Sequence, residues 1–156
     1  MSQVLSALSL WLHTLATVVM IGYYLQLSLV FMPCLGKELT GVAPLAALGA
    51  LARRMRPWLG VALLFFLLSG GFLTLADNYY PGFGQLLANT WTILMVAKHL
   101  VVLAMVAAAM YLNGILQRAE SPSTEPSSFG RARFAVHALS AMGVLVLLLT
   151  ALAEVQ

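Results

Sequence analysis

The sequence predicts an all-α integral membrane protein, a four-helix bundle with both termini on the outer, periplasmic side. Composition is the first indication: 62% of the 156 residues are hydrophobic and only 8% are charged, whereas a soluble domain carries about 25% charged residues. The second is that four segments are apolar over the roughly 20 residues that a helix needs to cross a bilayer. The formal net charge of +3 does not indicate a nucleic-acid partner, because the basic residues fall in connectors at the membrane edges.

The four segments leave little chain for a soluble domain, so residues 1–156 are predicted to form a single transmembrane domain. The helices are expected at about 5–32, 58–76, 91–116 and 134–155. Along the first, small and polar residues recur three or four apart, a spacing that forms one stripe on a helix. The stripe consists of Ser6, Ser9, His13, Thr17, Met20, Tyr24 and Ser28. It should face the bundle, and the other faces should contact lipid.

The remaining segments carry their polar residues at a few positions. The connector 37–57 is punctuated by Gly and Pro, and LAALGALARRM within it could form a short amphipathic helix at the membrane surface with arginines at its end. The second helix has small residues near its end, Ser69, Gly70, Gly71 and Thr74, which would let another helix or a flat ligand approach its backbone. The third carries Lys98 and His99 about a third of the way along, and the fourth holds His137 near its start.

The connectors predict the orientation. Seven of the eight Lys and Arg residues lie in the first and third connectors, and the eighth is Lys98. Because cytoplasmic loops carry the excess of Lys and Arg, these two connectors should be cytoplasmic and both termini should lie outside. The protein is therefore expected in the bacterial inner membrane.

This topology brings two histidines to one depth. His13 and His99 each lie about eight residues from the outer end of their helices, roughly 12 Å below the outer surface at 1.5 Å per residue. Gly70 and Gly71 reach a similar depth on the second helix. His137 lies near the cytoplasmic end, roughly 20 Å away, and is expected to be an interface-level residue.

Two histidines from different helices, with glycines on a third, are what a b-type haem needs, because its iron takes axial imidazoles and its flat ring needs a backbone without bulky side chains. The alternative is that both histidines are polar residues of the bundle interior, satisfied by Ser, Thr or Tyr. Lys98 could neutralise a haem propionate, reach outward to the interface, or be the functional cation itself.

The favoured function is a haem b-binding protein that transfers electrons, with the bilayer and other membrane or periplasmic redox subunits as partners. Whether it is an enzyme stays open, and an enzyme of this kind would be an oxidoreductase. A second function is copper transport or resistance, because eight methionines supply the soft thioether ligands that suit Cu(I). A third is a non-catalytic structural subunit of a larger membrane complex.

The order of these features resembles a superfamily of small four-helix membrane proteins that includes the CopD copper-resistance domain and the HemJ-type protoporphyrinogen oxidase. The first helix, WLHTLATVVMIGYYLQLSLVF, is similar to their opening pattern of an early His, a Gly about nine residues on and an aromatic stretch. The third is similar in placing Lys98 before a Leu-rich run that ends in Asn113 and Arg118, and SGGFLT at 69–74 resembles the small-residue end of their second helix.

The resemblance implies a functional pair of His13 and Lys98 with haem b as the cofactor, as in the HemJ-type enzymes, or copper handling, as in the CopD-like proteins. The chain departs from the HemJ-type pattern in two ways. The Pro-Arg pair after the aromatic stretch is absent, with Gln26 and Leu27 near that place, and His99 directly follows the Lys. These departures favour a bis-histidine haem over protoporphyrinogen oxidation.

Overall fold

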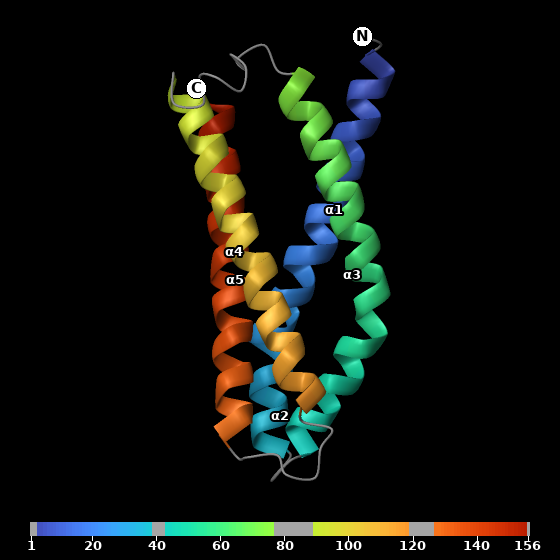
Figure 1. Cartoon of the computed structure of the whole chain (residues 1–156), viewed down its shortest axis with the longest axis vertical. Helices are drawn as coiled ribbons and strands as arrows, with labels where there is room; N and C mark the ends of the chain where they lie inside the picture. The colour runs from blue at the N-terminus through green and yellow to red at the C-terminus, as the bar shows by residue number, and fades with distance from the viewer. Residues whose placement is uncertain (1–2, 39–42, 77–88, 119–126, 156) are drawn as a thin grey trace.

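The computed structural model describes residues 3–38, 43–76, 89–118 and 127–155, and nearly all of them are helical. Four helices are long and apolar enough to cross a membrane, which confirms the predicted all-α, multi-pass bundle. Both termini lie at the same end of the bundle (Figure 1).

The first rod of the bundle is made of three consecutive elements, α1 (Gln3–Gln26), the π-helix η1 (Leu27–Phe31) and α2 (Met32–Glu38). The residues that flank η1 keep right-handed helical dihedrals, so the helix continues through it. A π-helical turn widens the helix by one residue, and it therefore rotates the faces of α2 relative to those of α1.

The second rod, α3 (Ala43–Ala76), differs from the prediction. The segment 43–57 was expected to be a connector with a short surface helix, but it is continuous with the second span and Pro57 lies inside the helix. The first turns bury Leu45, Leu48 and Ala52 against the core, and their spacing of three and four residues is that of one helix face. Burial of this face stabilises the helix across the proline, which removes one backbone donor and commonly bends a helix. Figure 1 shows α3 curved along its length.

The third and fourth rods are α4 (Thr90–Arg118) and α5 (Ser127–Glu154). At the start of α4 the Asn89 side chain accepts from the backbone N–H of Thr92 at 2.8 Å, a helix cap. Ser140 of α5 donates to the Tyr24 carbonyl of α1 at 2.7 Å.

The rods form two closely packed pairs, α1 with α3 and α4 with α5. The α1 and α5 rods join the two pairs, whereas α3 and α4 make few contacts with each other. The bundle is therefore least closed along the seam between α3 and α4.

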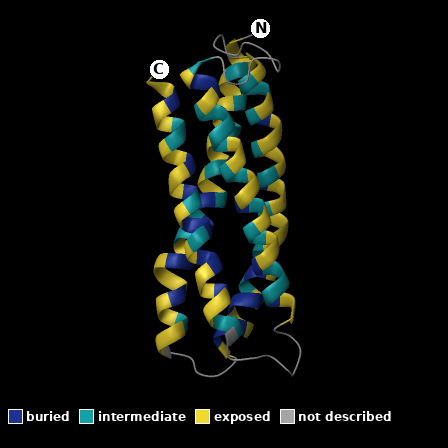
Figure 2. Cartoon of the chain, turned by 60° about the vertical axis from the view of Figure 1, so that its left-hand side comes forward, coloured by how far each residue is buried: buried dark blue, intermediate teal, exposed yellow. Residues whose placement is uncertain are grey.

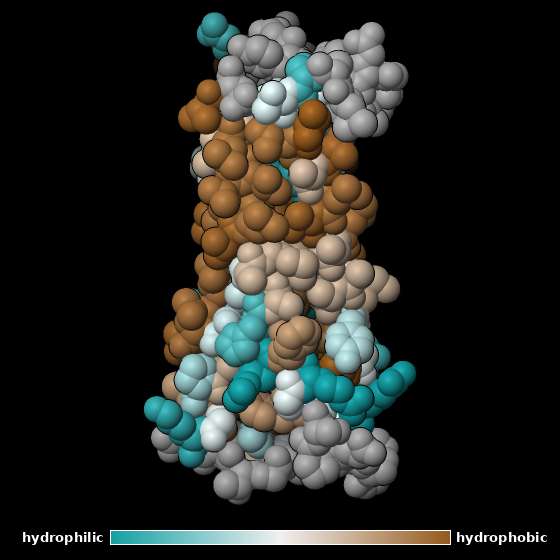
Figure 3. Space-filling view, turned by 90° about the vertical axis from the view of Figure 1, so that its left-hand side faces the viewer, coloured by the Kyte–Doolittle hydropathy of each residue, from teal (hydrophilic) through white to brown (hydrophobic). Residues whose placement is uncertain are grey.

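The best-packed part of the core lies toward the end of the bundle that carries the first and third connectors. Leu27, Leu48, Val136 and Leu139 are almost completely buried there, and Figure 2 shows the outer faces of the rods as mainly exposed. Many of these exposed residues are large and apolar, which is expected of surface in contact with lipid. Figure 3 shows an apolar surface over much of the bundle and hydrophilic residues near one end.

Candidate functional site

A cavity of about 320 Å³ lies toward the end of the bundle that carries both termini. It is called here the upper cavity. All five residues expected beside the cofactor line it: His13 from α1, Gly70 and Gly71 from α3, and Lys98 and His99 from α4. Residues far apart in the chain thus meet in one place, as the matching depths predict.

His13 is held firmly against α3. Its Nδ1 lies 3.2 Å from the Phe66 carbonyl oxygen and 3.2 Å from the Ser69 hydroxyl. The imidazole stacks on the Phe66 ring with a centroid distance of 4.5 Å and an interplanar angle of 24°. Because a carbonyl oxygen can only accept, Nδ1 carries the proton and Nε2 keeps a free lone pair. A backbone partner of this kind orients a histidine for metal ligation.

Gly70 makes this position of His13 possible. A Cβ at residue 70 would lie 2.8 Å from His13 Cε1 and 3.2 Å from Nδ1, a clash with the ring. Gly71 also lines the upper cavity, but a Cβ there would meet nothing within 4 Å. The two glycines, at least one of which was expected to face a cofactor, therefore have different surroundings.

His99 lies on the other half of the bundle. Its Nδ1 is 2.6 Å from the Met95 carbonyl of the preceding turn, so Nε2 again keeps the free lone pair. The side chain is exposed, whereas Lys98 is half-buried. Neighbouring residues on a helix point about 100° apart, which explains why His99 lies at the rim of the cavity while Lys98 lies deeper.

His137 lies outside both cavities described here. Its Nδ1 is 2.5 Å from the hydroxyl of Ser28, a buried residue of η1. This contact joins α5 to η1 and gives His137 a structural partner, away from the residues that line the upper cavity.

One charged lining residue was missed from the sequence. Glu154, near the end of α5, lines the upper cavity together with Lys98. The available signal was a lone carboxylate at the outer end of the fourth helix, on the same side of the membrane as Lys98 in the predicted topology. The pair gives the cavity a cation and an anion.

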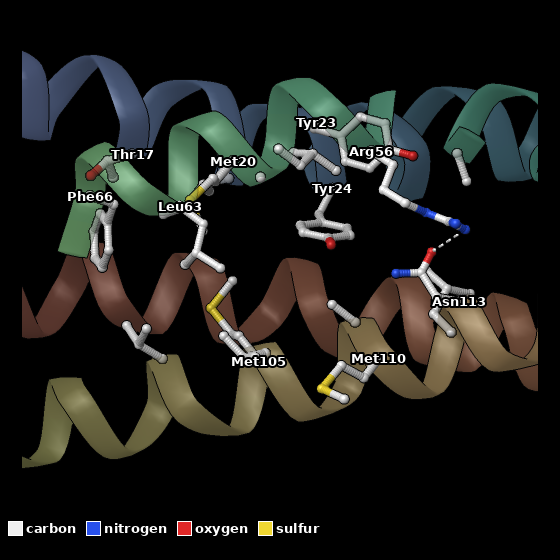
Figure 4. A pocket seen from close by; sticks show the side chains of 18 of the residues that line it. Thr17, Met20, Tyr23, Tyr24, Arg56, Leu63, Phe66, Met105, Met110 and Asn113 are labelled. Atoms are coloured by element: carbon white, nitrogen blue, oxygen red, sulfur yellow. Dashed lines mark hydrogen bonds between the residues drawn. The ribbon is translucent and has the colours of Figure 1, made fainter. Parts of the chain in front are cut away.

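A second cavity of about 240 Å³, called here the lower cavity, lies next to the upper one. The two share four lining residues, Thr17, Phe66, Val102 and Val146. Figure 4 shows Tyr23, Tyr24, Arg56 and Asn113 gathered at one end of the lower cavity and Phe66 and Thr17 at the other. Three methionines, Met20, Met105 and Met110, also line it.

The described residues contain no group of three or more His, Cys, Asp or Glu side chains placed to hold a metal ion. This finding bears only on a metal ion held entirely by three or more such side chains. A haem iron takes only its axial ligands from the protein.

Compared with protein-family models, with curated protein sequences and with solved structures, the chain matches none of them. The resemblance to the CopD-like and HemJ-type proteins stays a prediction.

Proposed function

We propose that this membrane protein binds haem b in the upper cavity, with His13 and His99 as axial ligands, and acts in electron transfer. The observation that carries the proposal is the meeting of two imidazoles from opposite halves of the bundle in one cavity. In both rings Nδ1 faces a backbone carbonyl, at 3.2 Å in His13 and 2.6 Å in His99. The nitrogen left free in each is Nε2, the atom that a haem iron would take.

The other lining residues suit the same group. Gly71 leaves open space beside the cavity, and Lys98 supplies a cation for a propionate. The cavity volume of about 320 Å³ is at the lower end of the range for ligand sites, and α3 and α4, which wall it, make few contacts. A flat ring could therefore extend into the seam between them. When bound, the haem would supply one-electron chemistry, while the protein holds the imidazoles and keeps bulk water away.

The orientation supports an outer-face redox partner. Seven of the eight Lys and Arg residues lie toward the ends of the helices that gather opposite the termini: the end of α2, the first part of α3, the end of α4 and the start of α5. By the positive-inside rule this basic end is cytoplasmic and the upper cavity is nearer the periplasm. The partners proposed for this exchange are membrane or periplasmic subunits of a bacterial inner-membrane complex.

Copper handling is the second candidate, and one observation favours it. The lower cavity gathers Met20, Met105 and Met110, and Met95 lines the upper cavity. Thioether sulfurs are suitable ligands for Cu(I), although methionine is also common filler between apolar helices. This candidate agrees with the CopD-like side of the resemblance.

An absorption spectrum of the purified protein, oxidised and then reduced, separates the two functions. We expect sharp α and β bands on reduction, and their loss or shift in the H13A and H99A variants. The matched control is H137A, which removes a histidine outside both cavities and should keep the bands. Bound copper with a featureless visible spectrum would favour the second function, and loss of the bands in H137A alone would contradict the proposed ligands.

A further inference from the structure

The lower cavity is amphipathic along its length. Most of its wall is apolar, contributed by residues such as Leu59, Leu63 and Val106. Apart from Thr17, its polar side chains collect near one end, where Arg56 of α3 approaches Asn113 of α4 (Figure 4). At 1.5 Å of rise per residue, the stretch of α3 from Arg56 to Phe66 spans about 15 Å. A ligand that matches this wall has a polar head and an apolar chain.

The charge at the polar end identifies the kind of head. The Arg56 guanidinium donates to the Asn113 side-chain oxygen at 3.5 Å, a long bond that uses one of its five N–H donors. No Asp or Glu is among the described residues that line this cavity. A carboxylate or phosphate head would neutralise the Arg56 charge and accept from its remaining N–H donors, because its oxygens bind a guanidinium in a bidentate manner.

The position of Arg56 and the seam beside it favour a ligand that comes from the bilayer. Arg56 directly precedes Pro57 and Trp58, in the half of α3 nearer its start at Ala43, which lies toward the end of the bundle opposite the termini. Arg and Trp at such a place lie at the depth of lipid headgroups. The cavity is walled by α3 and α4, which make few contacts with each other, so an acyl chain can enter sideways without crossing a packed interface.

We propose that the lower cavity binds an amphiphile with an anionic head and an acyl chain, its head on Arg56 and Asn113 and its chain running toward Phe66. A free fatty acid and an anionic phospholipid both have an anionic head and an acyl chain. The second chain of the phospholipid would remain in the bilayer. The head of this ligand lies apart from the proposed haem site, because Arg56 and Asn113 do not line the upper cavity, whereas the end of its chain approaches Phe66, which lines both cavities.

The test measures binding of radiolabelled palmitate to the full chain in phosphatidylcholine nanodiscs, with empty nanodiscs as the background. Unlabelled palmitate should displace the label, and hexadecanol, which has the same chain without the charge, should displace it at least about tenfold less well. R56Q should weaken palmitate binding by a similar factor. The matched control R54Q removes an exposed arginine two residues away that does not line the cavity, and it should bind as the wild type does.

A second variant tests the chain-binding part of the cavity. Gly60 lines it, and a Cβ there would meet nothing within 4 Å, so G60L adds bulk without a clash at Cβ and should reduce binding. If phosphatidylglycerol displaces the labelled palmitate as well as unlabelled palmitate does, the site accepts an anionic phospholipid. If only unlabelled palmitate displaces it, the ligand is a free fatty acid. Equal displacement by palmitate and hexadecanol, or unchanged binding in R56Q, would overturn the proposal. The absorption spectrum of each sample reports the haem site independently, and R56Q should leave it unchanged.

Discussion

At the residue scale, the position of His13 depends on the absence of a side chain at residue 70. The ring is held by the Phe66 carbonyl and stacks on the Phe66 ring, and a Cβ at residue 70 would clash with it. Helix geometry alone could predict that these residues share a depth, because rise per residue is constant. It could not predict that Gly70 accommodates the imidazole itself, since that depends on how α1 and α3 are rotated against each other.

The two glycines therefore provide a matched pair of variants. G70A should displace the His13 ring, weaken its bond to the Phe66 carbonyl and lower the haem content of the purified protein. G71A places its methyl group in open space and should keep the haem content, with a gain in helix stability of up to about 1 kcal/mol. Haem content per protein and thermal unfolding of both variants measure this. Full haem content with an unchanged spectrum in G70A would show that the close contact does not position a ligand.

The sequence also could not predict which of Lys98 and His99 would be more exposed. Both were expected near one cofactor, and both line the upper cavity. Adjacent residues cannot face the same direction on a helix, and only the packing of α4 against α5 decides which is deeper. The structure gives the deeper position to Lys98 and the rim to His99.

At the scale of the element, α3 shows why a proline was misread as a boundary. Pro57 lacks a backbone donor, but its φ is compatible with a helix. The residues before it bury one face through Leu45, Leu48 and Ala52, and tertiary packing of this kind outweighs local propensity. The sequence carried the i, i+3, i+7 spacing of that face, yet nothing in it showed that a partner surface was present.

Replacement of this proline tests whether the bend of α3 is needed. Pro57 is exposed, and an interior proline is less favourable in a helix than alanine by about 3 kcal/mol. P57A should therefore raise the midpoint of thermal unfolding while the helical circular-dichroism signal stays the same. A lower midpoint would show that the bend contributes packing energy that a straighter helix loses.

At the scale of the whole molecule, the composition and the four apolar segments were sufficient for the fold class. Four spans follow from length and hydropathy, and an even number of spans brings both termini to one end, as observed. The two pairs of rods and the open seam between α3 and α4 were not predictable, because apolar faces that meet lipid and apolar faces that meet protein have similar compositions.

The proposed orientation has a direct test. A reporter enzyme that is active only in the periplasm should be active when fused after residue 156 and inactive when inserted between 119 and 126, because the basic connectors are retained in the cytoplasm. The opposite pattern would place the upper cavity nearer the cytoplasm and reverse the side on which a redox partner binds.

The central claim is that a haem lies between two histidines in the upper cavity. Near-infrared magnetic circular dichroism of the oxidised, purified protein measures it most directly, because the energy of the low-spin ferric charge-transfer band depends on the pair of axial ligands. We expect the band of a bis-imidazole haem, from His13 and His99. A band of histidine–amine ligation would assign the second ligand to Lys98, and a protein purified without haem would contradict the claim altogether.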